Sequence, residues 1–166
     1  MAEKIVIDTG PLVAFARAEL LDVVGKLPFD FVCPDEVAQE LAFGAAAGYP
    51  RVEPIWLSHV TLSSPVSHVA ALALDAGAAA VIQLALEQGI CRVCVDERKG
   101  RLAAQWAKLD VVGSLGLLIR AKKLGLISAL KPQLEKLHRV GIYYHETLIR
   151  RVLEGVGEAD ADKEGM

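Results

Sequence analysis

Acidic residues follow two stretches of the sequence that have the composition of buried strands. Asp8 ends the apolar, β-branched run 5–7, and Asp96 follows the run 90–95. Glu40 lies on an expected helix after another such run, within reach of the same place. Carboxylates that meet in a cleft repel one another, and a hard divalent cation such as Mg²⁺ or Mn²⁺, which takes oxygen ligands, offsets that repulsion. Such an ion stabilises the charge that develops when a phosphodiester is cleaved.

We therefore predict that Asp8, Glu40 and Asp96 hold one Mg²⁺ or Mn²⁺ ion and are the catalytic residues. Each acid also has an ordinary structural explanation when it is taken alone. Asp8 suits a turn, Glu40 suits a solvated helix face, and Asp96 suits a helix cap. The strand-end position that Asp8 and Asp96 share favours the metal site over these explanations.

Short apolar runs alternate with helical patterns along the chain, and this alternation predicts how the acids are positioned. The expected strands are 4–8, 30–33, 60–62, 90–95 and 110–112, and the expected helices are one or two within 11–27, then 35–41, 66–74, 78–87, 98–109, 115–123, 129–139 and 145–153. Strands separated by helices predict an α/β three-layer sandwich, Rossmann-like, whose central parallel sheet of four to five strands is flanked by helices. In such sheets ligands bind outside the carboxyl ends of the strands.

The net charge of −3 hides a strong segregation of charge along the sequence. Residues 1–97 carry 5 Lys and Arg against 13 Asp and Glu, whereas residues 98–151 carry 12 against 3. Arg98, Lys99 and Arg101 follow directly on Asp96, so we expect them to bind nucleic-acid phosphates beside the site, with an affinity that falls as salt rises. Solvated, lysine-rich helix faces are the ordinary alternative.

Length and composition favour one folded domain. The chain has 166 residues, 53% of them hydrophobic, and we expect a single domain over 1–154 and a disordered acidic tail over 155–166. No uninterrupted apolar run approaches the length of about 18 residues that a membrane span needs, and no export signal is evident, so no membrane partner is expected. Three cysteines do not make a disulfide framework, which favours a reducing cytoplasm.

Aromatic and cysteine residues have less specific explanations. Trp106, Tyr143 and Tyr144 are candidates for stacking on bases. For Trp106, at helical spacing from Leu102, a position in the core is the expected alternative. The pair Cys91-x-x-Cys94 has metal-ligand spacing, but residues three apart on a strand point to opposite faces, so we expect a structural role.

Four segments in order resemble PIN domains (named for the PilT N-terminus), and more narrowly an uncharacterised prokaryotic branch of predicted nucleic-acid-binding proteins. They are Ile5-Val6-Ile7-Asp8-Thr9-Gly10-Pro11-Leu12, Pro34-x-x-Val37-x-x-Glu40-Leu41, Val95-Asp96-Glu97-Arg98-Lys99-Gly100-Arg101, and Val112-Gly113-Ser114-Leu115-Gly116 with its continuation to Ile127. The resemblance covers residues 4–154. It implies a PIN-like fold with a Mg²⁺- or Mn²⁺-dependent site that cleaves single-stranded RNA. Many relatives are toxins of VapC type, so it also implies an antitoxin protein as a partner.

The resemblance assigns the metal-site acids to Asp8, Glu40 and Asp96. Thr9 is an accessory residue, and Ser114 matches a position that usually carries Thr, a small hydroxyl near the metal. The sequence departs from the family at Ala78, where the branch has an acid after the glycine that matches Gly77. Two nearby acids, Asp75 and Glu97, are candidates to replace it.

Three functional hypotheses follow. The first is a ribonuclease, as the toxin of a toxin–antitoxin pair. The second is a degenerate PIN domain that, because of Ala78, binds nucleic acid or a protein partner without cleaving. The third is a regulatory protein whose acidic tail contacts another protein. The high apolar content also leads us to expect a homodimer.

Overall fold

Five parallel strands form the central sheet in the computed structural model, which describes residues 2–67, 70 and 73–158. The strands are β1 (Glu3–Ile7), β2 (Phe29–Pro34), β3 (Leu57–Val60), β4 (Arg92–Cys94) and β5 (Asp110–Val112). Their order across the sheet is β3-β2-β1-β4-β5, and each neighbouring pair runs parallel. The predicted α/β fold with a central parallel sheet is therefore confirmed.

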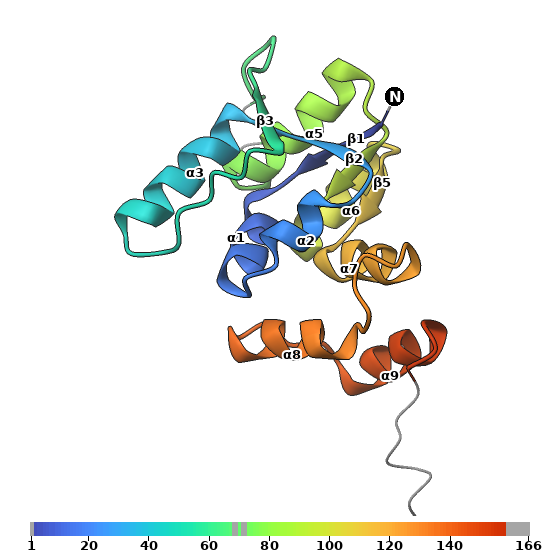
Figure 1. Ribbon diagram of the computed structural model, residues 1–166. Coiled ribbons are helices and arrows are strands. Elements are labelled where there is room, and N and C mark those ends of the chain that lie inside the picture. The colour runs from blue at the N-terminus through green and yellow to red at the C-terminus, as the bar shows by residue number, and fades with distance from the viewer. Residues whose placement is uncertain (1, 68–69, 71–72, 159–166) are drawn as a thin grey trace, which may run out of the picture.

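Helices cover both faces of this sheet (Figure 1). Their bounds are α1 (Thr9–Arg17), α2 (Leu21–Gly25), α3 (Asp35–Ala46), α5 (Ala76–Gln88), α6 (Arg98–Trp106), α7 (Ser114–Lys123), α8 (Lys131–Arg139) and α9 (Glu146–Gly155). Helix α5 packs across β1, β2 and β4 with α3 and α6 against it, whereas α1, α2 and α7 contact one another. This is the expected three-layer sandwich, and α8 and α9, orange and red, lie beyond α7 at one end of the molecule (Figure 1).

The interior strands β1 and β4 are apolar because helices cover both of their faces. Ile5, Val6 and Ile7 of β1 are fully buried, and so are Val93 and Cys94 of β4. Strands that are buried on both faces have continuous apolar runs instead of alternating ones. The chain passes from β1 to β2 on one side and later returns to β4 on the other side of β1. The point where strand order reverses is where open parallel sheets bind ligands, and here it lies between β1 and β4.

Strand register sets which residues emerge together at that edge. Ile7 pairs with Cys94, and Cys94 pairs with Val112. The ladder continues one residue further, since the Asp8 N–H donates to the Cys94 carbonyl at 3.0 Å and the Val95 N–H donates to the Val112 carbonyl at 2.9 Å. The residues that follow these three strands therefore leave the sheet at nearly the same level.

Some elements differ from the expected ones. Helix α3 continues to Ala46, five residues beyond its expected end, because Ala42, Ala45 and Ala46 favour a helix and outweigh the opposing preference of Gly44. Trp106 was expected in the core, and that prediction is wrong: its side chain is 85% exposed at the end of α6. The expected helix at 66–74 falls partly on residues 68–69 and 71–72, which lie outside the described residues.

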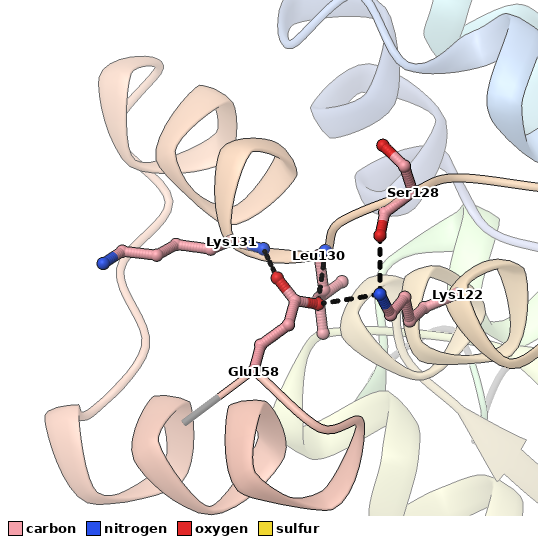
Figure 2. A network of polar contacts seen from close by, with 5 residues as sticks. All are labelled: Lys122, Ser128, Leu130, Lys131 and Glu158. Carbon is pink, nitrogen blue, oxygen red and sulfur yellow. Dashed lines mark hydrogen bonds and ion pairs between the residues drawn. The ribbon is translucent and has the colours of Figure 1, made fainter. Parts of the chain in front are cut away.

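Glu158, three residues beyond the end of α9, connects the C-terminal segment to α7 and α8. The backbone N–H groups of Leu130 and Lys131, at the start of α8, donate to the two Glu158 carboxylate oxygens at 2.7 and 3.2 Å. Lys122 of α7 forms an ion pair with the same carboxylate at 3.6 Å (Figure 2). Burial opposes ionisation of Glu158, but these hydrogen bonds and the Lys122 charge outweigh it and lower its pKa.

We expected the folded domain to end at residue 154. In the structure α9 ends at Gly155, and Glu158 still joins α7 to α8. Residues 159–166, the remainder of the expected tail, lie outside the described residues.

Candidate active site

Asp8 lies at the junction of β1 and α1 and caps the helix. Its backbone is extended, with φ −86° and ψ 167°, and its Oδ1 accepts a hydrogen bond from the Thr9 N–H at 2.8 Å. Pro11 follows in the first turn, where its missing N–H would have no partner within the helix. The short N-cap side chain is thereby held at the carboxyl edge of the sheet, and only 7% of Asp8 is exposed.

Several negative charges act on Asp8. Burial raises the pKa of Asp8 to about 7, and the carboxylates of Asp75, Glu40 and Glu97 add to the rise, against the lowering effect of the Thr9 N–H. Like charges that share a site make each ionisation less favourable. Three carboxylates from separate parts of the chain therefore lie near enough to Asp8 for their charges to act on it.

Glu40 reaches this cluster from α3. The Thr9 hydroxyl donates a hydrogen bond to Glu40 Oε2 at 2.7 Å, which fixes the carboxylate beside Asp8. Gly77, in the first turn of α5, gives the carboxylate its space, because a Cβ there would overlap Glu40 Oε1. The structure thus places the expected accessory residue Thr9 beside the expected acid Glu40.

Asp75 supplies an acid at the start of α5. Its side chain caps this helix by accepting a hydrogen bond from the Ala78 N–H at 2.8 Å, and its charge acts on Asp8. Ala78 itself is fully buried, and its Cβ would lie 3.8 Å from a Cβ added at Gly100 of α6. Asp75 is therefore a helix cap whose charge also acts on Asp8, three positions before Ala78, where the expected acid is missing.

Asp96 follows the end of β4 and is held by Ser114. The Ser114 N–H donates to Asp96 Oδ1 at 2.7 Å, and the Ser114 hydroxyl donates to Asp96 Oδ2. Ser114 is fully buried at the first position of α7. Both residues stand two positions beyond the paired residues Cys94 and Val112, so the sheet register aligns them. Glu97, and not Asp96, is among the carboxylates that raise the pKa of Asp8.

The three basic residues after Asp96 do not all face the same way. The half-buried Arg101 donates from Nη1 to the Val95 carbonyl at 2.9 Å. Arg101 Nη1 and Asp96 Oδ1 each lie 2.9 Å from the place of a Cβ on Gly113, so only a residue without a side chain fits between them. Arg98 is exposed, and Lys99 lines a separate hollow between α5 and α6. Arg101 is thus the one of the three that the structure places beside Asp96.

The acid cluster fits a divalent cation in its chemistry and charge. The ion pairs found among the described residues join Arg51 to Glu53, Arg92 to Glu3 and Lys122 to Glu158, so none of them neutralises these acids. All the side-chain donors are carboxylate oxygens, which Mg²⁺ and Mn²⁺ prefer. Within residues 2–67, 70 and 73–158, however, no three His, Cys, Asp or Glu side chains already converge on one point as a preformed metal site. A cation here would draw Glu40, Asp75 or Glu97 toward Asp8.

Some residues of this region carry no recognisable motif in the sequence. Tyr144 lies near Asp96: burial raises the pKa of Tyr144 to about 12, and the charges of Asp96 and Cys94 add to the rise. It lies 48 positions beyond Asp96 in the chain, so only the packing of the C-terminal segment brings the two together. The buried thiol of Cys94, whose pKa burial raises well above its usual value, packs in the core, and the three cysteines are free.

Comparison with known proteins gives one family match over most of the chain. A family model described as PIN domain matches residues 4–158. No curated protein matches the sequence. None of the helices in the described part of the chain is long and apolar enough to cross a membrane.

Proposed function

The chain belongs to the PIN-domain family, whose members are generally metal-dependent nucleases, and from that membership we propose that it is a ribonuclease that cleaves single-stranded RNA with Mg²⁺ or Mn²⁺. The observation that carries the proposal is the cluster of Asp8, Glu40 and Asp75 with Glu97, whose negative charge no ion pair among the described residues offsets. When bound, the cation supplies Lewis-acid stabilisation of the charge that develops on the phosphate.

The chain's own residues would hold the ion and position the strand. Asp8 is fixed by the α1 cap, Glu40 by the Thr9 hydroxyl, and Asp75 by the α5 cap. Asp96 is anchored by Ser114, and the neighbouring Arg101 would provide a positive charge for a phosphate oxygen. These hydrogen bonds orient each acid separately, and the acids would still have to approach one another to share one ion.

Asp75 favours a nuclease over a degenerate domain that only binds. The degenerate hypothesis rests on Ala78, but the start of α5 carries Asp75, whose charge reaches Asp8. That observation supports a cluster that keeps four acids. RNA binding without cleavage at any divalent metal concentration would favour the degenerate hypothesis instead.

Cleavage of labelled single-stranded RNA tests the proposal. Protein treated with EDTA should be inactive, and Mg²⁺ or Mn²⁺ should restore cleavage. Asp8→Asn, which keeps the α1 cap, should lower the cleavage rate at least about 100-fold, and Asp75→Asn at least about 10-fold.

The matched control is Asp22→Asn on α2, an exposed acid outside the cluster. Cleavage that survives EDTA, or that Asp8→Asn leaves unchanged, would refute the proposal, and single-stranded DNA of the same sequence tests the preference for RNA.

We extend the proposal to the cellular role and assembly. The resemblance to VapC-type toxins supports a cytoplasmic toxin with an antitoxin partner, so induction of the wild type, but not of Asp8→Asn, should arrest bacterial growth. Exposed apolar side chains on α5 and α6, namely Leu86, Leu102 and Trp106, support a homodimer. A solution mass of one chain at micromolar concentration would exclude the dimer.

A further inference from the structure

A cleft of about 800 Å³ opens beside Asp96 and Glu97. Its polar side consists of these two carboxylates and Arg101, and its apolar side comes from α7 and α9 through Leu115, Leu148 and Val152. Tyr143 and Tyr144 line it as well. A ligand that fits must therefore have a flat or apolar part for the far wall and a charged part for the side where Arg101 lies.

Tyr143 presents an aromatic ring at this cleft. It is 70% exposed, although it packs edge-on against His138, with the ring centroids 4.7 Å apart and an interplanar angle of 88°. Gly141, with φ of 91°, makes the turn that ends α8 and leads into this segment. The ring contacts His138 on one side and is otherwise exposed, so part of its surface is available for stacking.

The wall that carries Tyr143 and Tyr144 is anchored at both of its ends. Tyr144 is half-buried next to Asp96, and Leu153 of α9 is buried in the core. Beyond α9, Glu158 bonds to the start of α8 and to Lys122 of α7 (Figure 2). These contacts hold the wall of the cleft beside Asp96.

We propose that this cleft binds one nucleobase of the RNA, next to the phosphodiester at the acid cluster, with Tyr143 as the stacking surface and Arg101 on the adjoining phosphate. The inference rests on the proposed function and adds a base subsite to it. A nucleotide has the two parts that the cleft calls for: a base with flat, weakly polar faces and a phosphate with a negative charge. Stacking on an aromatic ring accepts every base, so the site gives affinity with little sequence preference.

Binding of a fluorescein-labelled single-stranded RNA decamer, measured by fluorescence anisotropy in EDTA so that metal-dependent cleavage is prevented, tests the subsite. Tyr143→Ala should weaken binding about 10-fold, whereas Tyr143→Phe, which keeps the ring, should stay within about 2-fold of the wild type. Tyr49→Ala removes another exposed tyrosine outside the cleft and is the matched control. Because Tyr143 is exposed, unchanged thermal unfolding should show that the variant is folded.

Decamers with one abasic residue at each position in turn locate the base that stacks. One abasic position should weaken binding to the wild type by the same factor as Tyr143→Ala and should add nothing to that variant, because each change removes the same contact. The subsite would be overturned if Tyr143→Ala bound RNA as tightly as the wild type. It would also be overturned if every abasic position weakened RNA binding by the same factor in Tyr143→Ala as in the wild type. If RNA is still cleaved in an Asp8-dependent manner, that result leaves the proposed function standing; absence of both binding and cleavage overturns the two together.

Discussion

The hydroxyl of Thr9 and the carboxylate of Glu40 are joined by a hydrogen bond of 2.7 Å across 31 positions of the sequence. The bond connects the first turn of α1, which follows β1, to the middle of α3. It links the residue next to Asp8 to a second acid, so the helix that caps Asp8 also orients Glu40. The acid cluster therefore depends on a neutral hydroxyl as well as on its charges.

Thr9→Val tests that dependence, because valine keeps the shape of threonine and removes the donor. A hydrogen bond to a charged group contributes about 1.5–3 kcal/mol, so we expect the affinity for Mn²⁺ to fall about 10-fold and cleavage at low metal to fall with it. Isothermal titration calorimetry measures the first effect. Thr9→Ser keeps the hydroxyl and should behave like the wild type; equal affinities for the valine and serine variants would contradict the role of this bond.

Gly77→Ala should displace Glu40, because the new Cβ would overlap the carboxylate. We expect weaker metal binding and at least about 10-fold slower cleavage, since a small misplacement of a catalytic group is costly. Gly155→Ala is the matched control: it lies at the end of α9, where an added Cβ meets nothing within 4 Å. Alanine there should leave cleavage unchanged. Full activity of Gly77→Ala would show that Glu40 has another position available.

The stability of the metal-free protein should fall as pH rises from about 4 to 7. The pKa of Asp8 is about 7 in the folded protein against 3.8 as its ordinary value, so the unfolded chain loses its proton first over this range. Ionised Asp8 then costs about 4 kcal/mol of folding free energy above pH 7, and nothing below about pH 4.

Urea unfolding in EDTA at pH 5 and pH 8 measures this change. Asp8→Asn, which carries no charge at either pH, should be the more stable protein at pH 8, while Asp22→Asn should follow the wild type. Mg²⁺ added at pH 8 should recover stability in the wild type and not in Asp8→Asn. A wild type whose stability does not change with pH would contradict the charge cluster.

Ser114→Ala should release Asp96 from one of its two hydrogen bonds while the backbone bond remains. We expect the turnover number to fall about 10-fold with little change in RNA affinity, because the acid loses its orientation and not its charge. Single-turnover kinetics with saturating protein separate these two quantities. Restoration of the hydroxyl by Ser114→Thr should recover turnover, and a loss of RNA affinity in the alanine variant would point to a role in binding instead.

Glu158→Ala should destabilise the protein by about 1 kcal/mol, the usual cost of removing a side chain that caps a helix. At this chain length the melting temperature should fall by about 2–4 °C. Glu154→Ala, which removes an exposed acid of α9, is the control. If Glu158→Ala and Glu154→Ala have the same melting temperature, the Glu158 carboxylate does not hold the C-terminal segment in place.

The alternation of apolar runs and helical patterns was enough to predict the parallel sheet, because buried central strands leave a strong signal. It also predicted that Asp8 and Asp96 emerge at one edge, since strand ends in a parallel sheet share a direction. The sequence made Glu40, Asp75 and Glu97 candidates for the site, but it could not predict that these three act on Asp8. Asp75 and Glu97 depend on how α5 and α6 approach the strand ends, and this is a matter of packing between distant segments.

Side-chain exposure was harder to predict than topology. Trp106 has helical spacing to Leu102, yet both lie on the outer side of α6, and the buried positions of that helix are Gly100 and Ala104. Small residues carry little hydrophobic signal, so the periodicity pointed to the wrong face. Tyr143 and Tyr144 were candidates for stacking on bases, but the sequence could not place them beside Asp96, because that position results from the fold of a segment far along the chain.

The position of Glu158 has a consequence for the order of events during synthesis. All four acids of the cluster lie before residue 98, whereas the wall of the cleft needs residues 142–152 and its fastening needs Glu158. A chain that stopped before residue 142 would therefore carry every one of these carboxylates but not the wall of the cleft. By the proposals above, competence to act on RNA would require synthesis of the chain as far as Glu158.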